Sequence, residues 1–331
     1  MRLVYFVYYL KNCDYSKLNN FQMYVRSLTG DGKLSQWASV FFNSLKYNIS
    51  IFEYYQFRFW EKNHTEKLSW AGTGYMYEFQ KKMNPLDMRN ILDDKREFFK
   101  KYSKFFIHNV YSLDTIKDNP LVLNELFNSS KFVFKVADGK CGVGVAILPK
   151  DSFNKEKIIS FMESNGYDLV ESYIEQHTDL QQLSPTAVNT VRIFTQLNSE
   201  NKADILGCRL RISVNCEVDN MAAGNLAASI DENSGILNGP GVYSDITKVD
   251  EKIHPITGTP IVGFQVPFWS ECLKLAKDAA IEHPQNRSIG WDIVVTPNGP
   301  GLIEGNHDWC KLVWQLPVKK GLKSKLMAYV S

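Results

Sequence analysis

The sequence predicts a mixed α+β protein with a helical N-terminal region, on three observations. Residues 1–90 carry aromatic and aliphatic side chains at three- and four-residue steps, the period of amphipathic helices. Residues 131–148 hold two runs of β-branched and aromatic residues around a glycine-rich turn, which is typical of paired strands. Near the C-terminus, 291–296 and 301–304 have the same character and flank a turn at 297–300. Helices are therefore expected first along the chain, and strands in its later part.

Composition narrows the class of protein. The 331 residues are 44% hydrophobic and 22% charged, the balance of an ordinary folded domain. A chain of this length buries roughly 75% of its unfolded surface, so it needs no disulfide or metal for stability. The formal net charge of +2 gives no general attraction to DNA or RNA. We therefore expect no nucleic-acid partner.

The sequence also bears on localisation. The apolar stretch at 3–10 is far shorter than the roughly 20 residues that span a bilayer, and it lacks a small-residue cleavage site. The six cysteines form no CxxC pair, so we expect reduced thiols rather than a zinc site or disulfides. A cytoplasmic protein is the expectation, with peripheral contact at the inner face of the membrane as an open alternative.

The N-terminal region contains an aromatic stripe that predicts one or two amphipathic helices. Burial of this stripe against the rest of the protein is the favoured interpretation. A surface for a membrane or a lipid-linked glycan is the alternative, because Lys46, Arg58 and Lys62 flank the aromatic residues. Asn84-Pro85 should end the region. The stripe comprises Trp37, Phe41, Phe42, Leu45, Ile49, Phe52, Tyr55 and Phe59.

A second region, 91–180, alternates helices and strands. One helix should begin at Leu92, and another should run from Ser152 to Ser164 because its apolar residues follow a helical period. Strands are expected at 131–136, 145–148 and 168–174.

The third region, 181–331, is richer in strand signals. Ser270 should cap a helix that ends at Glu282 before Pro284. The expected strands are 188–197, 205–214, 226–230, 291–296 and 301–304.

The most specific group of polar residues lies on the two last strands. Asp292 and Glu304 stand on strands joined by one tight turn, so their carboxylates can converge. Asn306 is two residues beyond Glu304 and should point to the same face. Two carboxylates and an amide oxygen suit Mg²⁺, which binds proteins through few carboxylates and completes its shell with water and phosphate. Surrounding apolar residues favour a site over a pair of surface acids.

A glycine-rich loop follows the strand at 131–136. Gly139, Gly142 and Gly144 would let backbone N–H groups approach anionic oxygens, while Lys135 and Lys140 add positive charge. The loop matches neither GxxxxGK[ST] nor a GxGxxG that opens a helix, so it predicts a different phosphate site or an ordinary turn.

Two further segments suggest ligand contacts. Residues 169–175 can offer backbone groups to an adenine edge, or form an ordinary edge strand. Arg192 and Arg211 lie among apolar neighbours, with Arg209 between them in the sequence. This setting indicates that they bind ligand anions or form buried ion pairs.

Other side chains are weaker candidates. Glu304, His254 or His307 can serve as a base, and the sequence does not choose among them. Trp269 and Trp309 can stack on a sugar or pack in the core.

The order of these elements resembles the ATP-grasp superfamily. Within it, four segments are similar to the sugar-transfer-associated ATP-grasp family, and the resemblance runs from about Asp94 to Gln315. The segments are VNTVRIFT, VDNMAAGNLAASID, HPITGTPIVGFQVPFW and IGWDIVVTPNGPGLIEGN. The resemblance implies an ATP-grasp fold with two α+β lobes around an ATP cleft: a small lobe at 91–180 and a large lobe at 181–331. Residues 1–90 depart from the superfamily's usual Rossmann-like domain, since they show no βαβ pattern.

The resemblance also implies roles for individual residues. Lys95 and Lys135 would contact the nucleotide phosphates, and Arg211 would face the transferring phosphate. The adenine would lie against Glu171 and the backbone of Tyr173 and Ile174, and the ribose against Glu175 or Asp179. Asp292, Glu304 and Asn306 would bind Mg²⁺, and Arg192 and Lys140 join Arg211 as catalytic candidates.

The implied activity is ATP-dependent ligation of a carboxylate and an amine through an acyl-phosphate, with ADP and phosphate as products. The family's name suggests bacterial surface or capsular polysaccharide, with an amino acid amine joined to a uronic-acid carboxylate. Open alternatives are a peptide or small-metabolite amide, phosphoryl transfer to a hydroxyl, and a nucleotide-binding scaffold without activity.

Overall fold

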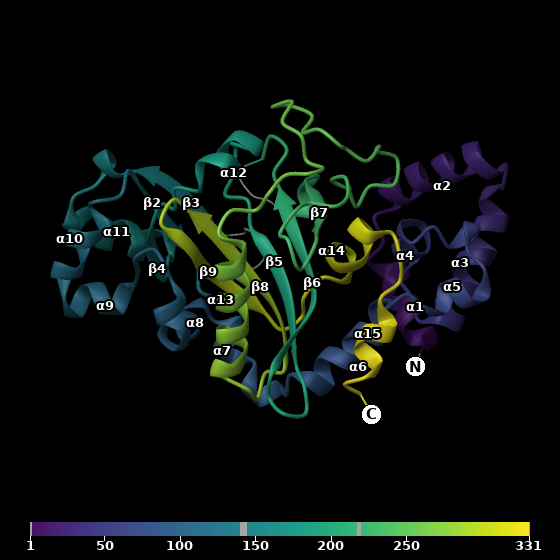
Figure 1. The fold of residues 1–331 in the computed structure, drawn as a ribbon, viewed down its shortest axis with the longest axis horizontal. Helices are drawn as coiled ribbons and strands as arrows, with labels where there is room; N and C mark the ends of the chain where they lie inside the picture. The colour runs from purple at the N-terminus through teal and green to yellow at the C-terminus, as the bar shows by residue number, and fades with distance from the viewer. Residues whose placement is uncertain (1, 140–143, 217–219, 331) are drawn as a thin grey trace.

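The computed structural model describes residues 2–139, 144–216 and 220–330. It contains two antiparallel sheets and a helical N-terminal region, so the predicted α+β class is confirmed. In Figure 1 the first sheet lies at the left, the second in the centre and the N-terminal helices at the right. Short 3-10 turns are η1 Phe59–Glu61, η2 Leu86–Met88, η3 Ser103–Phe105, η4 Pro120–Val122, η5 Lys150–Ser152, η6 Met221–Ala223 and η7 Leu316–Val318.

Six helices form the N-terminal region. The predicted aromatic stripe is divided between α3 and α4, because Asn48 ends α3 in the left-handed conformation (φ 57°) and Ser50 caps α4. Most of the stripe packs in one hydrophobic cluster, as the favoured interpretation predicted, although Phe42 stays exposed. The helices are α1 Arg2–Lys11, α2 Tyr15–Thr29, α3 Lys33–Tyr47, α4 Ile51–Gln56, α5 His64–Leu68 and α6 Thr73–Met83.

The prediction of one continuous helix from Leu92 is wrong, because the structure has two helices there, separated at Asp94. Asp94 has extended backbone and accepts hydrogen bonds from the N–H groups of Arg96 and Glu97. Its carboxylate therefore starts a new helix instead of continuing the first. The two helices are α7 Asn90–Asp93 and α8 Lys95–Tyr102.

The first sheet has the strand order β1–β4–β2–β3. Alternation along β2 sends Phe132 and Phe134 into a core under the covering helices, while Lys131, Val133 and Lys135 face the opposite side. The strands are β1 Val110–Ser112, β2 Lys131–Lys135, β3 Val145–Pro149 and β4 Leu169–Ser172. The accompanying helices are α9 Leu113–Asp118, α10 Leu123–Leu126 and α11 Lys155–Asn165.

The second sheet has the order β7–β6–β5–β8–β9. Helix α13 (Trp269–Glu282) packs against it, with Cys272 and Ala276 in the same core as Ile193 of β5. Ser270 does not cap this helix as predicted: Phe268 is the N-cap residue, without a side-chain hydrogen bond, and the Ser270 hydroxyl donates to Glu271. The strands are β5 Val191–Leu197, β6 Ala203–Ile212, β7 Leu226–Ile230, β8 Ser288–Thr296 and β9 Gly299–Asn306.

The remaining helices are α12 Thr178–Leu183, α14 Lys311–Gln315 and α15 Lys323–Met327. The last two pack into the N-terminal cluster, where Gln315 donates to the Ala71 carbonyl at 3.0 Å and accepts from its N–H at 2.9 Å. Helices α14 and α15 therefore connect the N-terminal helices to the second sheet, which α14 contacts at β6. Across the three described ranges, no helix is long and apolar enough to cross a membrane.

Candidate active site

A cavity of about 500 Å³ lies between the two sheets. The first sheet contributes residues such as Lys135 and Glu171, and the second contributes Asp292 and Glu304. The chain therefore brings together residues that are more than a hundred positions apart. The predicted site residues that line this cavity are Lys95, Lys135, Gly139, Glu171, Tyr173, Ile174, Arg211, Asp292 and Glu304.

Glu171 is the buried acid of the first sheet. Its Oε2 lies 2.6 Å from Lys135 Nζ and 3.2 Å from His108 Nε2. Burial alone would raise the pKa of Glu171, but the charge of Lys135 and the hydrogen bond with His108 outweigh burial and lower this pKa to about 2. The carboxylate is therefore charged at neutral pH and lies between Lys135, which also lines the cavity, and His108.

The sequence analysis missed His108. It precedes β1, and the antiparallel pairing of β1 with β4 carries it to Glu171, 63 positions along the chain. Its Nδ1 is buried and has no hydrogen-bond partner among the residues that the structure describes. No spacing or motif around this histidine marks it, so only the sheet topology reveals its contact.

Lys95 holds the loop that follows β2. Its Nζ contacts the carbonyl of Gly139 and lies 3.4 Å from the Val136 carbonyl oxygen, and its backbone N–H donates to Ala137. Burial lowers the pKa of the Lys95 ammonium, and nearby Lys135 acts in the same direction against the opposing effect of Glu304. The start of the glycine-rich loop is thus anchored beside the cavity.

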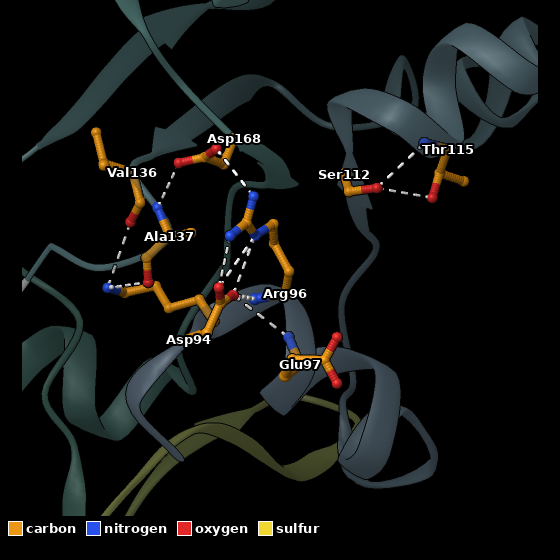
Figure 2. A network of polar contacts seen from close by, with 9 residues as sticks. Asp94, Arg96, Glu97, Ser112, Thr115, Val136, Ala137 and Asp168 are labelled. Atoms are coloured by element: carbon orange, nitrogen blue, oxygen red, sulfur yellow. Dashed lines mark hydrogen bonds and ion pairs between the residues drawn. The ribbon is translucent and has the colours of Figure 1, made fainter. Parts of the chain in front are cut away.

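A second network supports the same loop (Figure 2). Asp168 accepts a hydrogen bond from the Ala137 N–H at 2.7 Å and pairs with Arg96 at 3.4 Å. Arg96 in turn contacts Asp94, the residue that caps α8. The loop is therefore tied to the first turn of α8 and to the residue before β4.

The loop ends at a position that requires glycine. Gly144 has φ 74°, and a Cβ added there would lie 2.9 Å from Val136 Cγ2. Both the backbone conformation and the close approach exclude a larger residue. The predicted contacts of Lys140 and Gly142 lie outside the described residues.

Asp292 is bound by two arginines. It stands opposite Arg192 in the β5–β8 ladder, and Arg192 Nε and Nη2 lie 2.5 and 2.7 Å from its two oxygens. Arg211 Nη1 lies 3.1 Å from Oδ2. Burial would raise the pKa of Asp292, but the two guanidinium groups outweigh burial and lower it. Arg209 instead donates to the Trp314 carbonyl, away from this carboxylate.

The three predicted metal ligands are neighbours on β8 and β9. Asp292 pairs with Glu304, and Gly290 with Asn306, in the β8–β9 ladder. Asn306 Nδ2 lies 3.4 Å from Asp292 Oδ2 and 3.3 Å from the Gly290 carbonyl oxygen, so the amide oxygen is the atom left to bind a ligand. Within residues 2–139, 144–216 and 220–330, no group of three His, Cys, Asp or Glu side chains could hold a metal. Two carboxylates and an amide oxygen are donor types that Mg²⁺ accepts, and its binding by these three residues stays a prediction.

The other candidates lie away from this cavity. Glu175 and Asp179 are exposed and do not line it, so their contact with a ribose stays a prediction. Both ring nitrogens of His254 bond to backbone, since Nε2 lies 2.8 Å from the Ser213 carbonyl oxygen and Nδ1 accepts from Thr257 at 3.2 Å. Trp269 packs in the core beneath the second sheet.

Comparison with known proteins identifies the chain. The sequence model described as "Sugar-transfer associated ATP-grasp" matches residues 75–330. This chain belongs to the sugar-transfer associated ATP-grasp family. The comparison with curated proteins found no match.

Solved ATP-grasp structures resemble the family member at low identity. An ADP complex of N5-carboxyaminoimidazole ribonucleotide synthetase is 11% identical over 65% of this chain and 45% of its own, with a TM-score of 0.40. A RimK domain protein from Sphaerobacter thermophilus is 11% identical over 74% and 69%, with a TM-score of 0.38. Biotin carboxylase from Campylobacter jejuni is 13% identical over 70% and 47%, with a TM-score of 0.40. The chain thus spans less than half of the first and third structures.

The family member has a second cavity beside the first. It measures about 380 Å³ and adds Arg192, Asn306, His307 and the buried Trp309. His307 Nε2 lies 3.0 Å from Asp93 Oδ1. Among the residues that the structure describes, five line both cavities: Lys95, Gly139, Arg211, Asn220 and Glu304. The sequence analysis did not foresee Asn220, nor that Lys17 and Gln56 of the N-terminal helices would reach this wall.

Proposed function

We propose that this ATP-grasp enzyme is an ADP-forming carboxylate–amine ligase. The observation that carries the proposal is the shared edge of the two cavities, where Glu304 and Arg211 face both. A nucleotide in the first cavity and an acceptor in the second would meet at this edge. Phosphoryl transfer requires such a meeting, since its catalysis consists mainly of positioning and charge neutralisation.

The first cavity has the charges for a nucleoside triphosphate and Mg²⁺. Lys95 and Lys135 would bind phosphate oxygens, with the backbone at Gly139 beside them. Glu171 and the backbone of Tyr173 and Ile174 would bind the adenine. Asp292, Glu304 and Asn306 would hold Mg²⁺, which neutralises phosphate charge when bound.

The reaction needs no protein nucleophile. Transfer of the γ-phosphoryl group to a carboxylate oxygen converts a poor electrophile into an acyl-phosphate, and attack by the amine nitrogen then expels phosphate. Arg211 would neutralise the transferring group, and Arg192, which pairs with Asp292, would hold that carboxylate in position. His254 is not available as a base, because both of its ring nitrogens are bound to backbone.

The proposed substrates are an amino acid amine and the carboxylate of a uronic acid in a bacterial surface or capsular polysaccharide. The family's association with sugar transfer supports the glycan. A net charge of only +2 means that an acidic glycan would be attracted by the local basic residues of the cleft rather than by the whole protein.

We further propose a cytoplasmic enzyme that contacts the membrane through α1. Leu3, Val4, Val7 and Tyr8 of this helix are each more than half exposed. No acidic residue occurs from Arg2 to Cys13, whereas Arg2 and Lys11 are basic. An apolar face with basic ends suits the anionic surface of a bilayer, where a lipid-linked glycan would be assembled.

The test is ADP release from Mg-ATP in the presence of a hexuronate oligosaccharide and an amino acid. Release that requires both substrates, with an amide of the summed mass, supports the ligase. Hydroxylamine should trap the acyl-phosphate as a hydroxamate, whereas phosphoryl transfer to a hydroxyl gives no hydroxamate. Amide formation only with small amino or peptide acids would replace the glycan with the alternative substrate class.

A further inference from the structure

Lys17 lies where two hollows meet outside the nucleotide cavity. The second cavity, described above, has Lys17 and Gln56 on its N-terminal wall. A third hollow of about 320 Å³ continues between α2 and the segments around 222 and 244. Lys17, Ala222 and Ser244 line both hollows. The reacting edge at Glu304 is therefore connected, through the second cavity, to a groove on the N-terminal helices.

The Lys17 ammonium lies over two aromatic rings, in a hollow that the carboxylates of Asp14 and Asp245 and the ammonium of Lys248 also line. Asp14 uses its carboxylate to cap α2 through the Lys17 backbone N–H. The ammonium lies 5.6 and 5.5 Å from the ring centres of Phe21 and Phe52, which position a cation without neutralising its charge. Among the residues that the structure describes, no carboxylate forms an ion pair with Lys17. Lys17 and Lys248 balance the two carboxylates of the third hollow, and on the wall of the second cavity Lys17 is a partly buried cation that can bind an anionic ligand.

The walls around Lys17 are held together and are polar. Gln56 is buried and donates from Nε2 to the Ser244 carbonyl oxygen at 3.0 Å, which joins α4 to the opposite wall. Ser16 and Asn20 add a hydroxyl and an amide on the α2 side of the third hollow. Short hydroxyl and amide groups around a fixed cation suit a ligand with many hydroxyls and a negative charge.

We propose that the N-terminal helices form the acceptor site, and that Lys17 binds a carboxylate of an acidic glycan extending through both hollows. The inference rests on the proposed function only in placing the reacting end of the glycan at Glu304 and Arg211. The carboxylate at Lys17 belongs to a different sugar unit from the one that reacts, so the acceptor is at least two units long. Lys17 and Gln56 lie outside the residues 75–330 that match the family. This recognition would therefore come from the N-terminal helices that precede the matched residues.

The test measures binding of oligogalacturonates of one, two and three units by calorimetry, with and without a nonhydrolysable ATP analogue and Mg²⁺. Wild-type affinity should rise with length. Lys17→Gln should weaken binding of the trimer by about tenfold or more, since a hydrogen bond to a charged group is lost, and should abolish the length preference. Lys17→Arg should retain both. Lys46→Gln is the matched control, because Lys46 also lies over an aromatic ring, at 5.6 Å from the Tyr47 centre, and lines neither hollow.

Three results would overturn the inference: trimer affinity unchanged in Lys17→Gln, equal binding of a neutral malto-oligosaccharide of the same length, or binding of tri-glutamate in preference to the acidic glycan. Affinity for the ATP analogue is measured separately and should be the same in Lys17→Gln and wild type. Failure of the wild-type protein to bind the nucleotide would contradict the proposed function, while the nucleotide-free titrations would still decide the role of Lys17.

Discussion

Asp292 illustrates how single residues shape this site. Its two oxygens receive Arg192 and Arg211, and its ladder partner Glu304 faces both cavities. Removing one member of such a buried charge group leaves the others uncompensated, so Asp292 variants would mix effects on folding and on ligand binding. Glu304 is the cleaner position, because it is only partly buried and the arginines bind its neighbour instead.

We expect Glu304→Ala to reduce turnover by about 10³-fold or more while the fold is retained. The reason is the loss of a charged metal ligand at the point where the two cavities meet. Steady-state ADP release measures the loss, and the thermal midpoint of the nucleotide-free protein is the control. Wild-type turnover in this variant would refute the metal role.

Glu171 should make stability depend on acid pH. Its pKa is lowered from 4.5 to about 2 in the folded protein, so the unfolded chain binds its proton first as the pH falls. The resulting stabilisation, on the order of 3 kcal/mol, is complete above pH 4.5 and is lost as the pH falls toward 2. Urea unfolding at pH 5, 4 and 3 should show a shallower decline in Glu171→Gln than in wild type. Parallel declines would show that this carboxylate is not held in its charged form.

At the scale of elements, the features that could be predicted from the sequence were those set by neighbouring residues. The hairpin of β8 and β9 follows from its turn residues, so the meeting of Asp292 and Glu304 could be predicted from neighbouring sequence. The His108–Glu171 contact could not, because it depends on which distant strands pair. The break at Asp94 was missed because the apolar pattern continues across it, while the hydrogen bonds of its carboxylate favour a new helix start.

A buried carboxylate joins three helices, and its loss should destabilise the protein. Glu53 of α4 accepts from the N–H groups of Ser50 at 2.8 Å and Thr73 at 2.9 Å, and lies 3.0 Å from Lys311 Nζ of α14. Glu53→Ala should cost about 3 kcal/mol of unfolding free energy, because it leaves the partly buried Lys311 ammonium and two backbone N–H groups without their partner. Chemical denaturation measures this cost.

The matched control is Asp278→Ala on the surface of α13, which removes the exposed partner of Lys274 and should cost less than about 1 kcal/mol. Combining Glu53→Ala with Lys311→Met should recover part of the loss. Equal costs for the buried and exposed pairs would contradict the structural role of Glu53.

The α1 surface leads to a binding prediction. Replacing both Val4 and Val7 with serine should weaken sedimentation with vesicles of phosphatidylglycerol and phosphatidylcholine several-fold, because apolar contact area is lost. Leu34→Ser is the control, since Leu34 is 88% exposed but lies on α3. Binding that is indifferent to Val4 and Val7, or to the anionic lipid, would exclude α1 as the contact.

At the scale of the whole molecule, the hydrophobic clusters show how the parts are connected. One cluster joins the N-terminal helices to α14 and α15, a second underlies the large sheet, and a third supports the small sheet. Phe98 and Tyr102 of α8 pack in the second cluster rather than the third. The division at residues 90 and 180 remains a prediction.

Sequence reasoning did not place the N-terminal helices at the site. Their periodicity predicts which faces are buried, but not which surface they are buried against. That surface is supplied by residues near the other end of the chain, including Trp314 and Leu326. Packing between distant segments therefore forms the second cavity, and the function proposed for it depends on this assembly.

The central claim is that the first cavity holds ATP through Mg²⁺ bound by Asp292, Glu304 and Asn306. Calorimetric titration of a nonhydrolysable ATP analogue, with Mg²⁺ and with EDTA, tests it most directly. We predict tight binding to wild type that weakens by about tenfold or more in EDTA, and a smaller response to the metal in Glu304→Gln and Asn306→Ala. Nucleotide binding that does not depend on Mg²⁺, or that these two variants leave unchanged, would contradict the claim.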